Sequence, residues 1–253
     1  MKYNEYTEIN IRSLLYKGRK NMRKWILRAT VLFCTALLLT TGVSAAVSAS
    51  DTAYAVEGGN IYFNTSKGNI TGADADITAA AIPAEIDGVA VTTIDARAFE
   101  NCTKLTQVTI PDGVTTLGEY MLKGTAVTEI TIPSTVTKST GYWNGALAGS
   151  NRLTKVAFAP GTTAIPASIC ASDNFISAID EVVIPSGVKS IGAKAFYDCT
   201  MLKTLQLPDS VTTIASDAFS GMDLEAVYIP CEDSDVAITL IDMEVPFIAS
   251  RLA

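Results

Sequence analysis

Histidine is absent from the 253-residue chain, which restricts the chemistry that its side chains could perform. Without imidazole there can be no Ser-His or Cys-His nucleophile and no histidine-ligated metal centre. Nucleotide-binding glycine motifs and C-x-x-C pairs are also missing, so the sequence indicates no cofactor.

Acidic residues are the remaining candidates for catalysis, because a glycosidase needs two carboxyl groups that converge on one pocket. None of the acidic groups has the D-x-D-x-D-G spacing of a calcium loop. Since Asp and Glu are mostly exposed in proteins, we expect a solvated surface with no catalytic residue and no metal site. The groups considered are Asp74 with Asp76, Asp180 with Glu181, and Glu232 with Asp233 and Asp235.

An aromatic segment favours binding over catalysis. Residues 140–145 read Thr-Gly-Tyr-Trp-Asn-Gly, and Trp25 is the only other tryptophan. An amphipathic aromatic pair between glycines suits sugar stacking or a protein hot spot. We therefore predict ligand contacts at Tyr142, Trp143 and Asn144, and at Phe175 in the following insertion. The alternative is that Trp143 packs into the core.

The chain that carries these residues is built from a repeated sequence motif. An L-x-x-V-x-I core is followed by proline, with successive prolines 22 to 28 residues apart. Apolar residues two apart share one face of a short strand, and proline ends that strand. A single coil cannot bury its own apolar edge, so a period in the twenties predicts a β-rich solenoid of about seven stacked coils. The prolines are Pro83, Pro111, Pro133, Pro160, Pro185, Pro208 and Pro230.

Stacking would turn each outward strand position into a column of side chains. These columns are small, polar or mixed, which suits a shallow contact face. A generic solvated strand face, rich in threonine, explains the same composition. The candidate contacts on this face are Gln107, Glu129, Lys155, Glu181 and Tyr228.

The repeated motifs resemble a known family. P-[DS]-[GS]-V-T-T-[IL], then A-F-x-x-C, then L-x-x-[VL]-x-[IL]-P, is similar to the BspA-like class of bacterial leucine-rich repeats, over residues 77–230. The resemblance implies a right-handed stack of short parallel strands joined by turns or short helical segments. It also implies a secreted or cell-surface protein associated with adhesion, and hence an extracellular protein or glycan partner.

The two ends of the chain depart from the repeat. Residues 1–46 have a basic start, an apolar run at 29–39 and small-residue cleavage sites, which predict a secretory signal. Its proportions favour Met22 as the true start, with residues 1–21 an upstream start-site artefact or an extended n-region. Residues 47–76 are expected to form an N-terminal β cap, with a hairpin of 61–64 against 69–72. Residues 231–253 are expected to cap the last coil, and a truncated gene remains a possibility.

The exported part is strongly acidic. Residues 1–46 contain 8 of the 19 basic and 2 of the 26 acidic residues, which leaves 11 against 24 and a net charge of −13. Such a field repels phosphate backbones and anionic lipid surfaces, so we expect neither nucleic acid binding nor membrane insertion after signal removal. The oligomeric state stays open.

Four cysteines remain after export: Cys102, Cys170, Cys199 and Cys231. Cys102 and Cys199 occupy the same coil position about four coils apart, too far for a disulfide. Core packing is the favoured interpretation. Cys170 and Cys199, in neighbouring coils, are the one pair that could bridge.

These observations predict a secreted, non-enzymatic repeat protein that binds or adheres through its strand face and the 142–144 loop. A passive spacer, or a fragment of a larger surface protein, is the first alternative. A carboxylate-based hydrolase is the second, and it would require two acids within roughly 10 Å in a cleft.

Overall fold

The computed structural model describes residues 51–232 and 234–249. The predicted signal region therefore lies outside the described residues, as do residues 47–50 of the predicted cap. Within the part described, none of the helices combines the length and apolar character that crossing a membrane requires.

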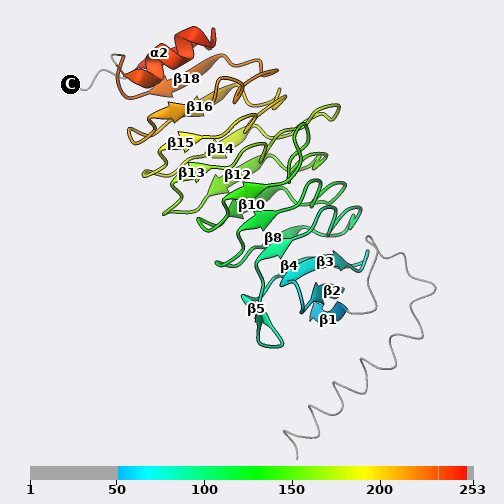
Figure 1. Cartoon of the computed structure of the whole chain (residues 1–253). Helices are drawn as coiled ribbons and strands as arrows, with labels where there is room; N and C mark the ends of the chain where they lie inside the picture. The colour runs from blue at the N-terminus through cyan, green and yellow to red at the C-terminus, as the bar shows by residue number, and fades with distance from the viewer. Residues whose placement is uncertain (1–50, 233, 250–253) are drawn as a thin grey trace, which may run out of the picture. The chain divides into compact units, whose positions relative to one another are not determined.

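The described chain is a solenoid whose repeated core phrase forms short parallel strands stacked one on the next (Figure 1). The stacking is in register, since Ile130 in one coil pairs with Val156, and Val156 pairs with Val182. The predicted fold is therefore confirmed. The strands are β4 (Ala79–Ala81), β8 (Gln107–Thr109), β10 (Glu129–Ile132), β12 (Lys155–Phe158), β14 (Glu181–Val183), β16 (Thr204–Gln206) and β18 (Ala226–Ile229).

The V-T-x-I phrase after each proline forms a second series of two-residue parallel strands. Threonine suits this position because its hydroxyl reaches the neighbouring coil: Thr115 Oγ1 donates to the Thr92 carbonyl at 3.3 Å, and Thr212 Oγ1 to the Lys189 carbonyl at 3.3 Å. These bonds add polar links between coils. The strands are β7 (Thr93–Ile94), β9 (Thr116–Leu117), β11 (Lys138–Ser139), β13 (Ala164–Ile165), β15 (Ser190–Ile191) and β17 (Thr213–Ile214).

An antiparallel sheet covers the start of the stack. The predicted hairpin forms between β2 (Gly59–Asn64) and β3 (Asn69–Ala73), and Ile70 of β3 pairs in parallel with Ile94 of β7. Sequence reasoning missed β1 (Asp51–Val56), which pairs along the whole of β2. A small hairpin of β5 (Glu85–Ile86) and β6 (Val89–Ala90) follows β4.

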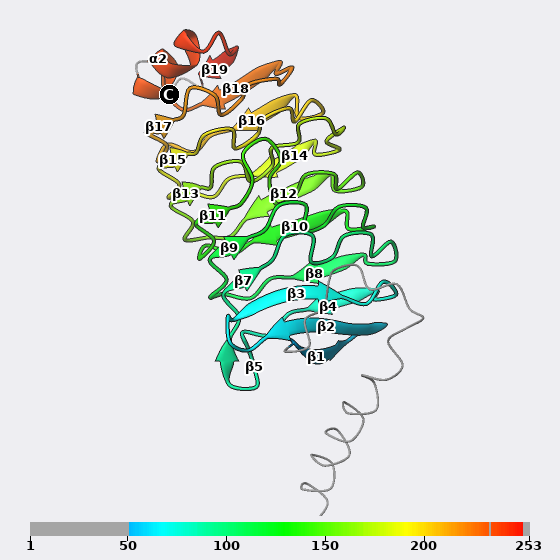
Figure 2. The ribbon, with the colours of Figure 1, turned by 45° about the vertical axis from the view of Figure 1, so that its right-hand side comes forward.

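A helix and a strand cover the last coil (Figure 2). Helix α2 (Asp235–Asp242) begins at Ser234, whose hydroxyl accepts the Ala237 N–H at 3.2 Å as an N-cap. Val236 and Leu240 of this helix are buried in the common core. Strand β19 (Phe247–Ala249) then pairs in parallel with β18.

The cysteines confirm the packing interpretation, and the disulfide alternative is wrong. Cys170, Cys199 and Cys231 are free thiols, and the three cysteines inside the coils, Cys102, Cys170 and Cys199, are buried. Cys199 Sγ lies 3.3 Å from the Cys170 carbonyl and donates a hydrogen bond to it. Burial raises the pKa of Cys199 to about 12 and also raises the pKa of Cys170.

Thiol reactivity tests this assignment. In protein that starts at residue 47 and is prepared without reductant, we expect Cys231 alone to react with Ellman's reagent at pH 8, because it is exposed while the others are buried thiols. Denaturant should release all four. A total of only two reactive thiols after unfolding would contradict the assignment and indicate a disulfide.

Candidate functional site

The predicted aromatic loop projects from the coils with its rings exposed. Tyr142 is 65% exposed and Trp143 is 47% exposed, whereas Ala146 and Leu147 are buried in the core of this coil. The alternative that Trp143 packs into the core is therefore wrong. Asn144 is half-buried, and its Oδ1 is buried without a hydrogen-bond partner among the described residues.

Main-chain contacts fix the loop against the following coil. The Asp173 N–H donates to the Trp143 carbonyl at 3.1 Å, and Ser168 Oγ donates to the Tyr142 carbonyl at 3.1 Å. A Cβ at Gly145 would lie 1.5 Å from the Ser168 carbonyl oxygen, so only glycine allows this approach. The insertion at 140–145 therefore lies beside the following insertion, around Ser172.

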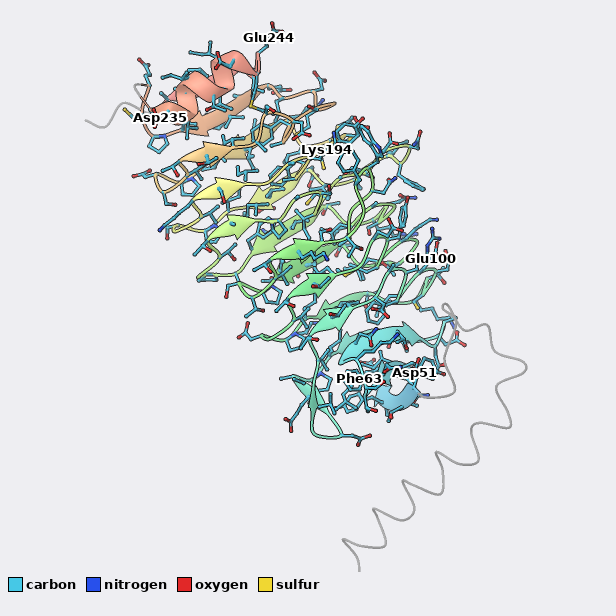
Figure 3. The ribbon with its side chains drawn as sticks, viewed as in Figure 1. Asp51, Phe63, Glu100, Lys194, Asp235 and Glu244 are labelled. Atoms are coloured by element: carbon cyan, nitrogen blue, oxygen red, sulfur yellow. The ribbon has the colours of Figure 1, made fainter. Side chains whose placement is uncertain are left out.

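A lysine lies beneath the exposed rings. Lys194 Nζ is 4.2 Å from the centroid of Trp143, 5.0 Å from that of Tyr197 and 5.1 Å from that of Tyr142. Trp143 also meets Tyr142 and Tyr197 edge-on, at 5.0 and 5.3 Å between centroids. The ammonium forms an ion pair with Asp217 at 3.2 Å. This lysine, labelled in Figure 3, makes the loop part of a cation–aromatic cluster.

A second cluster of the same kind involves Phe175. Its ring meets Tyr120 edge-on at 5.8 Å, and Lys123 Nζ lies 5.3 Å from both ring centroids. The Arg97 guanidinium lies 4.9 Å from the Tyr120 centroid. The two clusters contain five rings, and we call this set the aromatic ridge: Tyr120, Tyr142, Trp143, Phe175 and Tyr197.

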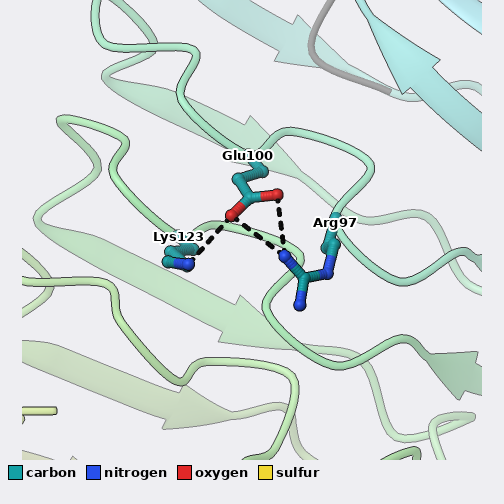
Figure 4. A network of polar contacts seen from close by, with 3 residues as sticks. All are labelled: Arg97, Glu100 and Lys123. Atoms are coloured by element: carbon teal, nitrogen blue, oxygen red, sulfur yellow. Dashed lines mark hydrogen bonds and ion pairs between the residues drawn. The ribbon is translucent and has the colours of Figure 1, made fainter. Parts of the chain in front are cut away.

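Glu100 neutralises the cations of the second cluster (Figure 4). Its Oε1 lies 3.0 Å from Lys123 Nζ, and its Oε2 lies 3.3 Å from Arg97 Nη1. Burial raises the pKa of Glu100, but the hydrogen bonds and charges of Lys123 and Arg97 outweigh it and hold this pKa below its ordinary value. The carboxylate is therefore ionised at neutral pH.

Sequence reasoning missed the cations and two of the rings. Arg97 and Lys194 directly precede the Ala-Phe segment of their coils, and Tyr120 stands at the matching position between them. All three have a left-handed backbone, with φ between 53° and 62°. Comparing the residues at this turn position from coil to coil, as we did for the strand positions, would have found Arg97, Tyr120 and Lys194.

The strand-face candidates form a separate group. Glu129, Lys155 and Glu181 lie side by side on β10, β12 and β14, and Lys155 Nζ is 2.6 Å from Glu181 Oε1. The hydrogen bond from Lys155 to Glu181 raises the pKa of this lysine. Gln107 on β8 and Tyr228 on β18 are also exposed, on other strands of the same series. The ridge belongs to the turns, so the structure divides the predicted site residues into two sets.

Two of the candidate catalytic acids have structural partners. Asp74 accepts hydrogen bonds from the Asn60 N–H and side chain and from the Tyr62 hydroxyl within the N-terminal cap. Asp76 pairs with Lys104 at 2.6 Å. Residues 51–232 and 234–249 contain no group of three or more Cys, Asp or Glu side chains arranged to hold a metal ion.

The repeat pattern identifies the family. The family model described as the BspA type leucine rich repeat region matches in six copies, over residues 77–178 and 174–238. The chain belongs to this BspA-type family. No curated protein sequence matches it.

Solved structures similar to this BspA-type protein include a leucine-rich repeat protein from Eubacterium ventriosum, with 27% identity over 70% of this chain and 52% of that one, at a TM-score of 0.46. A leucine-rich repeat protein from Bacteroides ovatus is 22% identical over 70% and 55%, at 0.37. A leucine rich cell surface protein from Faecalibacterium prausnitzii is 21% identical over 70% and 54%, at 0.39. The chain thus spans about half the length of these proteins.

Replacing Glu100 tests the electrostatics of the ridge. Because the folded pKa lies below that of an unfolded glutamate, about 4.3, the carboxylate stabilises the fold above that pH, and this stabilisation is lost as the pH falls through the folded value. Glu100→Gln should lower the free energy of unfolding by about 1 kcal/mol at pH 6. Urea unfolding at pH 3 should show a much smaller difference.

The control is Asp223→Asn, which removes the exposed partner of Lys203. An exposed pair contributes little, so this variant should unfold like the parent at both pH values. An equal loss at pH 3 and pH 6 in Glu100→Gln would contradict the role assigned to the charge.

Proposed function

We propose that this BspA-type protein is a secreted or cell-surface, non-enzymatic module that recognises an extracellular protein or glycan through the aromatic ridge. One observation carries the proposal: Tyr142 and Trp143 are exposed on a loop whose backbone is hydrogen-bonded to the next coil. Large aromatic side chains held in place before binding contribute contact area at little cost in conformational entropy. Such residues dominate binding energies at interfaces.

The charges around the ridge favour a neutral ligand surface. Lys123 and Arg97 are paired with Glu100, and Lys194 is paired with Asp217. The pKa of Asp198, which follows Tyr197 of the ridge, is raised mainly by burial and also by the nearby charge of Asp173. With its cations already paired, the ridge suits stacking against sugar rings or apolar protein groups better than phosphate or anionic lipid.

The proposed export rests on two observations: residues 1–46 have the features of a secretory signal, and the chain belongs to a family associated with the cell surface. The strand stripe of Glu129, Lys155 and Glu181 extends the proposed contact area as a secondary, polar surface. Adhesion is then the consequence of a binding module displayed outside the cell.

An assembly role is the second candidate, and a specific observation favours it. Helix α2 exposes Ile238 and Ile241, and β19 is the last strand of its sheet and exposes Ile248. An apolar end with a strand at the edge of its sheet, among the described residues, is the kind of surface through which repeat units associate. Concentration-dependent mass by light scattering would separate this role from ligand binding.

Binding to immobilised glycans, mucins and matrix proteins tests the main proposal. Trp143→Ala should weaken a hit by about 30-fold, equivalent to the 2 kcal/mol of a hot spot. The matched control is Tyr54→Ala, which removes an exposed aromatic side chain from the N-terminal cap. Circular dichroism should show that both variants are folded.

Equal binding by the parent and a folded Trp143→Ala variant would contradict the proposed site. If neither the parent nor the variants bind a ligand and the parent self-associates, the assembly role would be favoured.

A further inference from the structure

Lys194 is the only buried charged side chain among the described residues, at 7% exposure. Burial of an ammonium group is costly unless partners replace its water. Here the partners are one carboxylate, Asp217 at 3.2 Å, and the faces of three aromatic rings. This is the composition of an aromatic cage that binds ammonium ligands, but the chain supplies the cation itself.

The cage joins the inserted loop to the regular coils. Tyr142 and Trp143 belong to the insertion, whereas Lys194, Tyr197 and Asp217 belong to the two coils after the neighbouring insertion. Asp217 holds Lys194 at two points, because its Oδ1 accepts the Lys194 N–H at 3.2 Å and its Oδ2 pairs with the ammonium. The cation is therefore anchored to the stack before it meets the loop.

The main-chain bonds of the loop leave its rings without support. Ser168 and Asp173 bind the carbonyl groups of Tyr142 and Trp143, which fixes the backbone but not the side-chain torsions. Tyr142 and Trp143 pack edge-on against each other, so each could turn without breaking those hydrogen bonds. Trp143 also meets Tyr197 edge-on at 5.3 Å, and the Lys194 ammonium is the one group that contacts all three rings.

We propose that Lys194 is a positioning residue for the ridge: its charge fills the cage from within, holds Tyr142 and Trp143 in their exposed orientation, and excludes cationic groups of a ligand from the cage. The consequence for ligand choice rests on the proposed function. The orientation of the rings does not, because it is a property of the free protein.

The test uses the full chain with Trp25→Phe, which leaves Trp143 as the only tryptophan. Lys194→Met keeps the length of the side chain and removes the charge. Lys194→Arg keeps the charge, and an arginine also stacks on aromatic rings. Lys189→Met, at an exposed position of the same coil, is the matched control.

In Lys194→Met we expect the rings to lose their fixed orientation, because a desolvated cation–aromatic contact is removed. The Asp173 amide, which donates to the Trp143 carbonyl, should exchange its hydrogen as in the parent, because that bond fixes only the backbone. Acrylamide should quench Trp143 fluorescence more strongly, and tetramethylammonium should quench or shift it only in this variant. Lys194→Arg should restore parent behaviour, and Lys189→Met should not differ from the parent.

Parent-like quenching by acrylamide in a folded Lys194→Met variant would overturn the proposal. Equal loosening by Met and Arg would also overturn it, because shape rather than charge would then be responsible. If Lys194→Met fails to fold, Asp217→Asn removes the anchor instead and should loosen the rings in the same direction. A variant with loosened rings that binds its ligand as the parent does would leave Lys194 in its role and contradict the proposed function.

Discussion

Parallel stacking of coils is the constraint on which the rest of this structure depends. A coil of about 22 residues has too few apolar side chains to enclose a core, so its apolar edge is buried only by an identical edge above and below. The register pairs Ala80 with Val108 and Leu205 with Val227, each buried residue against its counterpart. Because the register is fixed, the residues at all remaining positions of the repeat also align from coil to coil.

The same constraint explains where variation is tolerated. Each coil is supported only by its neighbours, so residues added to a turn do not disturb strands on the other side of the coil. The insertion at 140–145 leaves β10 and β12 paired in register. Its cost is local: Gly145 passes so close to the Ser168 carbonyl that no side chain fits. The second strand series, by contrast, is interrupted between β11 and β13, so the insertion leaves the strands paired on only one side of the coil.

The repeat pattern predicted the features that recur from coil to coil and missed those that depend on one contact between particular residues. The parallel strands, the hairpin at 61–72 and the buried cysteines follow from spacing and residue size. Strand β1 was missed because it pairs with a cap, where no repeat applies. The contact of Lys194 with Tyr142 was missed because it depends on how an insertion folds back on a coil 52 residues later. Neither residue belongs to a strand column.

The placement of charge bears on the proposed recognition. Residues 47–253 are acidic, yet three of their few cations lie against aromatic rings, and each is paired with a carboxylate. Paired cations cannot steer an anionic ligand over a distance. They can orient rings, because a cation–aromatic contact strengthens where water is excluded, as at Lys194. The basic residues beneath the ridge are therefore placed to act on the ridge itself, and the surface available for the proposed ligand is the outer face of its aromatic side chains.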